Sequence, residues 1–121
     1  MAADPGALAE LYAPAFIVGG PEGSRAFEND ARFVEWLDQA MTFNRDHGMR
    51  TLEVVSLHRV ELSPIHDLAL VTWGARFEKT GARIIQFTIS YVLERVEDGR
   101  RILAYVSRGD QNAEMAKEGL L

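Results

Sequence analysis

The sequence contains no cysteine among its 121 residues. This absence excludes disulfide bridges, thiol catalysis and zinc or iron–sulfur centres held by cysteine. Long apolar runs are also missing: the longest uncharged stretches, residues 11–21 and 84–93, fall well below the ~20 apolar residues that a membrane-spanning helix requires. The N-terminus carries Asp4 and Pro5 in place of the basic and apolar regions of a signal peptide. We therefore expect a cytoplasmic protein that does not contact membranes.

Basic residues are few in this chain. Lys and Arg number 13 against 18 Asp and Glu, which gives a formal net charge of −5 and excludes the basic surface typical of nucleic-acid-binding proteins. His47, His58 and His66 are not spaced as metal ligands. The sequence also has no phosphate-binding loop, no glycine-rich dinucleotide motif and no serine-nucleophile elbow. We expect neither a metal nor a cofactor.

The apolar content is that of an ordinary globular protein. Hydrophobic residues make up 47% of the chain, and six Phe, three Tyr and two Trp supply large side chains for a core. A chain of this length buries roughly two-thirds of its unfolded surface, which is enough for one core and too little for two. The sequence therefore predicts a single domain over residues 1–121.

The first half of the chain predicts helices. Asp4 and Pro5 suit an N-cap and a first helical position, and apolar residues at helical spacing follow until Pro14. A short apolar stretch at 16–18 precedes a glycine-containing turn at 19–24.

A second helix begins at Asn29 or Asp30 and ends before Gly48, which suits the position after a helix C-terminus. Its apolar stripe consists of Phe33, Trp36, Leu37, Ala40 and Met41.

From Thr51 onward the apolar period changes from 3.6 to 2, which predicts strands. Four are expected, over about 51–62, 68–78, 83–96 and 101–108. The Asp-Gly turn before the last strand is a strong hairpin signal. Helices followed by consecutive antiparallel strands predict an α+β fold.

The region near the C-terminus allows more than one structure. The last hairpin permits two registers, with Tyr91 opposite either Val106 or Tyr105, and a one-residue slip exchanges the faces of the strand. Beyond that hairpin, residues from Asp110 to Gly119 predict a short helix.

The order of elements and several segments together resemble a known superfamily. The segments are Leu8-Ala9-Glu10-Leu11-Tyr12-Ala13-Pro14-Ala15-Phe16-Ile17-Val18, Pro21-Glu22-Gly23, the strands around Trp73 and Tyr91, and Gly109-Asp110-Gln111-Asn112. The chain resembles the nuclear transport factor 2-like superfamily, also called SnoaL-like, whose members include ketosteroid isomerase, scytalone dehydratase and polyketide cyclases.

The resemblance implies a cystatin-like cone. In that fold N-terminal helices pack in a strongly curved, mainly antiparallel sheet of at least four strands, around an apolar pocket. It also implies a homodimer formed through the outer face of the sheet, which suits a third strand that is apolar on both faces. Relatives usually begin with a longer helix than Met1 to Ala7 leaves room for.

The resemblance does not extend to the chemistry of ketosteroid isomerase. That enzyme uses a general-base Asp together with a Tyr and a protonated Asp. The corresponding place for the base holds Gly19-Gly20-Pro21, and the place of the protonated Asp holds Ser90 or Tyr91. Tyr12 lies in the segment after the missing first helix and does not match the family's Tyr.

His58 and Asp110 are the remaining candidates for acid–base catalysis. His58 follows the alternation that carries Val54 and Val60, so it serves either as an acid or base in a pocket or as a core histidine with one hydrogen-bond partner. Some cyclase-like relatives use a carboxylate near the position of Asp110, whose other role is to cap the C-terminal helix.

The pocket is predicted to be lined by aromatic and other large side chains. The candidates are Tyr12, Phe16, Trp36, Met41, His58, Trp73, Tyr91 and Tyr105. The alternative for each aromatic ring is simple packing in the core. The sequence thus predicts a domain that binds an apolar small molecule, with cofactor-free isomerase, cyclase or dehydratase activity if it is catalytic. The alternative is a non-catalytic module that dimerises or docks another protein, and polar groups converging inside a cavity would argue against it.

Overall fold

The computed structural model describes residues 4–81 and 84–109. In chain order its elements are α1 (Pro5–Ala9), β1 (Tyr12–Gly20), β2 (Gly23–Glu28), α2 (Ala31–Asp46), β3 (Met49–Glu61), β4 (His66–Phe77), the short 3-10 helix η1 (Glu78–Thr80), β5 (Ile85–Val96) and β6 (Gly99–Ser107). The predicted α+β class is confirmed. The C-terminal helix predicted from Asp110 lies outside the described residues.

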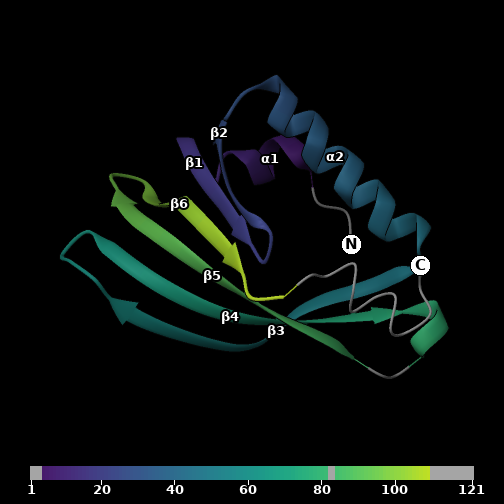
Figure 1. The fold of residues 1–121 in the computed structure, drawn as a ribbon. Helices are drawn as coiled ribbons and strands as arrows, with labels where there is room; N and C mark the ends of the chain where they lie inside the picture. Colours follow the sequence, from purple (N-terminus) through teal and green to yellow (C-terminus); the bar gives the residue numbers. More distant parts are fainter. Residues whose placement is uncertain (1–3, 82–83, 110–121) are drawn as a thin grey trace.

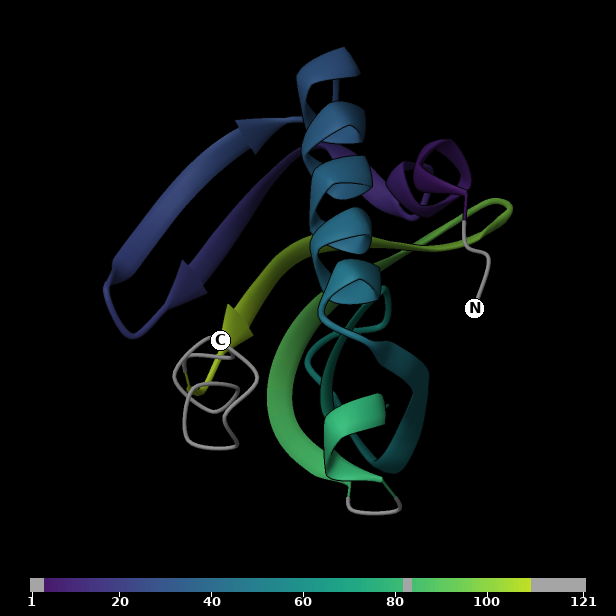
Figure 2. The same ribbon diagram turned by 90° about the vertical axis from the view of Figure 1, so that its right-hand side faces the viewer.

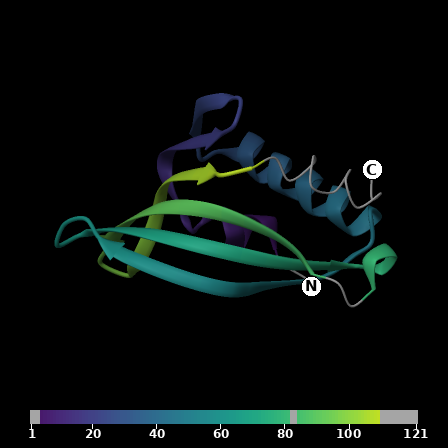
Figure 3. The same cartoon turned by 60° about the horizontal axis from the view of Figure 1, so that its bottom comes forward.

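The described strands form one six-stranded sheet in the order β2-β1-β6-β5-β4-β3. All neighbours are antiparallel except β1 and β6, which run parallel. The sheet bends strongly, and α2 lies across its hollow side (Figures 1 and 2). Figure 3 shows the β1–β2 hairpin standing away from the long strands β3, β4 and β5. The fold is that of the predicted curved sheet around helices.

The first helix is shorter than the sequence predicted. Asp4 caps it as expected, since its carboxylate accepts a hydrogen bond from the Gly6 N–H, but α1 ends at Ala9. The Leu11 carbonyl instead accepts a hydrogen bond of 2.7 Å from the Ile102 N–H, and Tyr12 pairs with that same residue of β6. Pairing with the last strand therefore draws this segment into the sheet.

The turn predicted at 19–24 is shorter in the structure, and a further strand follows it. Only residues 21 and 22 turn, and Gly23–Glu28 returns antiparallel to β1 as β2. Five of the six β2 residues are exposed, and the segment Gly-Ser-Arg-Ala-Phe-Glu lacks the alternation of apolar and polar residues that would predict a strand.

Helix α2 agrees closely with its prediction. Asp30 caps it by accepting hydrogen bonds from the N–H groups of Arg32 and Phe33. Gly48, at a φ of 84°, follows its end in the left-handed conformation that glycine adopts without strain. Trp36 is the exception in the predicted stripe, because 48% of it is exposed. No helix among the described residues is long and apolar enough to cross a membrane.

A bulge in β3 changes which of its side chains share a face. The pairing with β4 shifts between Val54 and Ser56, so that Val54 stands opposite Trp73 whereas His58 stands opposite Leu70. Trp73 and Leu70 are three residues apart in β4, so their side chains point to opposite faces of the sheet. The side chains of Val54 and His58, which stand opposite them, therefore also point to opposite faces. The prediction that they share a face was therefore wrong.

The last hairpin adopts the register that pairs Tyr91 with Tyr105. A shift between Val92 and Leu93 accompanies it, and Gly99 after the turn has a φ of 138°. Both tyrosines therefore point to the same face of the sheet.

That face is the concave one, which looks toward α2. It carries Phe16 and Val18 of β1, which pack with α1 and α2, together with Tyr105, Tyr91 and Trp73 on the adjoining strands. Two separate apolar clusters of described residues stabilise it. One centres on Ala9, Phe16, Phe33 and Leu37, and the other on Ala75, Phe77 and Ile85 at the opposite end of β4.

Candidate functional site

All three tyrosines of the protein gather on the concave face. The rings of Tyr91 and Tyr105 lie 6.2 Å apart between centroids. Tyr12 approaches from β1, close enough for its hydroxyl to interact electrostatically with both others. Trp73 donates a hydrogen bond of 3.2 Å from its indole N–H to the Tyr91 hydroxyl. We call Tyr12, Trp73, Tyr91 and Tyr105 the tyrosine cluster.

Tyr12 is held in place from several sides. Its ring lies 4.8 Å from Phe16 and 4.9 Å from Phe33, measured between centroids. The Asn29 amide donates hydrogen bonds to the backbone carbonyls of Ala9 and Tyr12, at 2.8 and 3.1 Å. These contacts join α1, β1 and the start of α2, so they fix the tyrosine at the junction of three elements.

The indole bond determines what Tyr91 offers to a ligand. Because its oxygen accepts from Trp73, its own hydrogen remains available for donation to a second acceptor. A carbonyl or hydroxyl oxygen on the concave face would meet this donor. The cluster is therefore equipped to bind an oxygen atom of an otherwise apolar molecule.

Burial raises the pKa of each hydroxyl in the cluster above the ordinary value of 10.0. For Tyr12 the neighbouring hydroxyls of Tyr91 and Tyr105 raise the pKa further, whereas the bond from Trp73 partly offsets the effect at Tyr91. The three groups are thus neutral hydrogen-bond donors over the physiological pH range.

Alkaline titration should reveal this burial directly. Because the folded pKa values exceed the unfolded value of 10.0, burial of these groups stabilises the fold fully below pH 10, and that contribution is lost as the pH rises toward the folded values. We expect little tyrosinate absorbance at pH 10 in the folded protein, and its appearance together with loss of circular dichroism at higher pH. Titration of the tyrosines at pH 10 in protein that remains folded would contradict the burial.

A buried carboxylate lies further along the same face. Asp67 is only 6% exposed and stands two residues before Ala69, which pairs with Tyr91. Its oxygen accepts a hydrogen bond of 3.1 Å from Arg100 and lies 3.9 Å from a guanidinium nitrogen of Arg59. Because Asp67 is buried and accepts a hydrogen bond from Arg100, we assign it to holding that arginine in place.

Two hollows are lined in part by members of the tyrosine cluster. The first, of about 380 Å³, lies beside the β1–β2 hairpin and is lined by Val18, Arg25, Phe27 and Tyr105 among others. The second, of about 730 Å³, lies between the start of β1 and the β5–β6 turn, where Tyr12, Asn29 and Arg100 contribute to its wall. Each hollow thus includes one tyrosine of the cluster.

The predicted pocket residues divide into three groups. Tyr12, Trp73, Tyr91 and Tyr105 come together as described. Phe16 is 2% exposed and belongs to the core, and Met41 is half-buried on α2. Trp36 and His58 are exposed, and His58 is on the convex face, away from the tyrosine cluster. Asp110, the other candidate for catalysis, lies outside the described residues.

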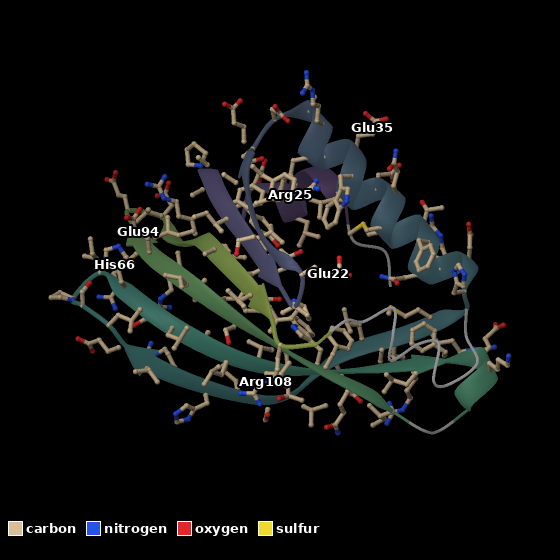
Figure 4. The ribbon with its side chains drawn as sticks, viewed as in Figure 1. Glu22, Arg25, Glu35, His66, Glu94 and Arg108 are labelled. Carbon is tan, nitrogen blue, oxygen red and sulfur yellow. The ribbon has the colours of Figure 1, made fainter. Side chains whose placement is uncertain are left out.

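His66 belongs to a charged group at the far end of the sheet (Figure 4). Its ring contacts the Ser63 hydroxyl at 2.8 Å and the Glu94 carboxylate at 3.4 Å. Arg101 donates to the same carboxylate at 2.9 Å and, with His66, lowers the pKa of Glu94. Within residues 4–81 and 84–109, no three His, Asp or Glu side chains gather closely enough to hold a metal ion.

Sequence reasoning missed Asp67, Arg100 as its partner, and Arg25. The sequence predicted Asp67 as part of a turn, and Arg25 lies in a strand that the sequence did not predict. The pairing of Asp67 with Arg100 crosses β5, so no local spacing signals it.

Residues 1–110 match a protein family described as NTF2-like protein (DUF6841). The chain belongs to this family. The resemblance drawn from the sequence is thereby confirmed at the level of the NTF2-like group. No functionally curated protein matches this NTF2-like chain.

Solved structures with the same fold include proteins from several bacteria. A cystatin-like domain of unknown function from Nostoc punctiforme has a TM-score of 0.63 and 14% identity, over 96% of this chain and 72% of that one. An NTF2-like protein of unknown function from Shewanella oneidensis has the same TM-score and identity, over 87% and 83%. A protein with a ketosteroid isomerase-like fold from Catenulispora acidiphila, in complex with trimethylamine, has a TM-score of 0.57 and 13% identity, over 99% and 85%. At these identities the similarity shows the NTF2-like fold alone.

Proposed function

We propose that this NTF2-like domain binds a small, mainly apolar molecule against the tyrosine cluster. The observation that carries the proposal is the bond from Trp73 to Tyr91, which leaves an oriented hydroxyl donor among half-buried aromatic rings. Ligand sites typically combine an apolar lining with a few polar groups that fix orientation. The cluster has this composition, and two of its members, Tyr105 and Tyr12, each line one of the two hollows.

The arrangement supports binding more strongly than acid–base catalysis. Catalysis of isomerisation, cyclisation or dehydration needs a group that exchanges a proton near neutral pH. The tyrosines hold their protons there, and Asp67 is paired with Arg100. Cofactor-free catalysis is therefore the narrower proposal, because it needs a proton-exchanging group and the buried carboxylate Asp67 is engaged with Arg100.

The two tryptophans allow a direct test of the binding site. Trp36→Phe leaves Trp73 as the only indole, whereas Trp73→Phe leaves the exposed Trp36 as a matched control reporter. We expect benzylacetone, an apolar ketone, to change the fluorescence of the Trp73-only protein in a saturable way and to leave the Trp36-only protein unchanged. No response of Trp73 to a broad panel of apolar ketones would overturn the proposal.

Removal of one hydroxyl refines this test. Tyr91→Phe should weaken binding of benzylacetone by roughly threefold to tenfold, because one hydrogen bond to its carbonyl is lost. Butylbenzene, which has no oxygen, serves as the matched ligand, and its affinity should stay the same. Equal weakening of both ligands would mean that the substitution alters packing and not a hydrogen bond.

A second proposal concerns the convex face of the sheet, where we propose that two copies of the chain associate. An apolar row crosses five adjacent strands there without interruption. It consists of Val60, Leu68, Val92, Ala104 and Ile17. Ile17 is 49% exposed, and Val106 in the neighbouring row is 48% exposed. An uncharged strip of this kind matches an identical strip in a symmetric dimer.

A further inference from the structure

Arg25 places a positive charge on the concave side, beside Tyr105 of the tyrosine cluster. Arg25 of β2 stands opposite Val18, which in turn stands beside Tyr105. Residues paired across neighbouring strands point to the same face, so all three side chains point to the concave side. In Figure 4 Arg25 extends from the hairpin on the side of α2. Within the described residues Arg25 has no ion-pair partner within 4.0 Å.

The hollow next to Arg25 has a mixed lining, in which apolar side chains lie beside Ser24, Ser107 and several glycines. Val18 and Phe27 supply the apolar surface, and Tyr105 connects it to the tyrosine cluster. The hydroxyl of Ser107 is already engaged, since it donates to the Gly109 carbonyl at 2.6 Å. Among the described residues of the lining Glu22 is the one acid; it sits in the exposed hairpin turn and forms no ion pair with Arg25. A single unpaired guanidinium thus stands at the edge of an apolar surface in this part of the structure.

We propose that this hollow binds the carboxylate of a small amphiphilic organic acid. Arg25 would hold the carboxylate, and the apolar part of the acid would lie on Val18 and Phe27 and point toward Tyr105. A guanidinium presents paired N–H donors that match the two oxygens of a carboxylate. This inference rests on the proposed function, because it names the chemical class of molecule for the same site.

The charges in the hollow favour a monoanion. The described lining carries one guanidinium, one carboxylate at Glu22 and no second basic residue, so a phosphate dianion would meet more repulsion there than a monoanion. A cation would be attracted by the aromatic rings but repelled by Arg25. The protein of similar fold from Catenulispora acidiphila is in complex with trimethylamine, which is an amine and not an acid. The test below therefore compares ligands of opposite charge.

The size of the hollow also fits a small acid. Its volume of about 380 Å³ lies at the lower end of the range for small-molecule sites, which is roughly 300–1,000 Å³. Gly20 contributes to its wall, and a Cβ atom built at this position would meet nothing within 4 Å. A side chain there would therefore occupy the space that the ligand needs.

Three matched ligands test the charge preference on the full-length protein. They are hydrocinnamate, its neutral amide and phenylpropyl trimethylammonium, with binding measured by calorimetry. We expect the wild-type protein to bind hydrocinnamate about tenfold more tightly than the amide, as a charge-assisted hydrogen bond predicts. Arg25→Gln should remove this preference and leave binding of the amide unchanged. Arg32→Gln, which removes an exposed arginine outside the hollow, should keep it.

A steric variant tests the location independently. Gly20→Val should weaken binding of both hydrocinnamate and the amide at least about fivefold, because its side chain narrows the hollow, while circular dichroism stays that of the wild type.

The outcomes separate this inference from the proposed function. Equal binding of acid and amide, with no effect of Arg25→Gln, overturns the inference and leaves the proposed function standing. A preference for the trimethylammonium compound overturns it as well. Failure of all three ligands to bind the wild-type protein, together with no response of Trp73 to apolar ketones, overturns both.

Discussion

Phe16→Ala is expected to lower the free energy of unfolding by about 3–5 kcal/mol, the range usual for removal of a fully buried phenylalanine. Phe16 is 2% exposed, and its ring lies 4.6 Å from that of Phe33, 4.8 Å from Tyr12 and 5.8 Å from Phe27, between centroids. No single neighbour can fill the cavity, because these rings come from three different elements. Urea denaturation followed by circular dichroism measures the loss.

Leu62→Ala is the matched control for this prediction. Leu62 follows β3 and is 54% exposed, so its truncation should change the free energy of unfolding by less than about 1 kcal/mol. The comparison also distinguishes the two roles predicted for Phe16 from the sequence. Shortening a residue that lines an open pocket lowers the free energy of unfolding only slightly. A decrease below about 1.5 kcal/mol for Phe16→Ala would therefore argue that Phe16 lines a pocket and does not belong to the core.

Val106→Glu is expected to convert the proposed dimer into monomers, with a rise in the dissociation constant of at least about 100-fold, because two copies would bring the new carboxylates into an apolar contact. Val106 is 48% exposed in the single chain, so the substitution should leave the monomer folded. Sedimentation equilibrium at micromolar concentration measures the change in mass.

Leu57→Glu provides the control for the dimer. Leu57 is 64% exposed and stands opposite Val71, which places it on the concave face, so its charge should leave the dimer intact. A wild-type protein that sediments as a monomer would reject the convex face as a site of self-association. A Val106→Glu protein that remains dimeric would place the contact elsewhere.

Much of the fold could be predicted because local signals were strong. Asp30 and Gly48 mark the two ends of α2, and the alternation from Thr51 onward predicts β3 to β6. The elements that escaped prediction depend on distant pairing. The segment after Ala9 has helical spacing, yet it becomes β1 because it pairs with β6, which lies far along the chain.

The candidate site was predictable only in part, for the same reason. Aromatic composition pointed to Tyr91, Tyr105 and Trp73, but their shared face depends on a register that the turn sequence left open. Unbroken alternation predicts that His58 lies either in a pocket or in the core. The bulge after Val54 places His58 on the convex face, and the residue types of β3 do not predict a bulge.

The parallel pairing of β1 with β6 has a consequence for synthesis on the ribosome. Tyr12 leaves the exit tunnel long before its partner Ile102 and the rest of β6 are made. Until then one backbone edge of β1 has no neighbouring strand, and contacts between such distant residues form slowly. The nascent chain therefore carries an unpaired strand edge until β6 emerges and closes the sheet.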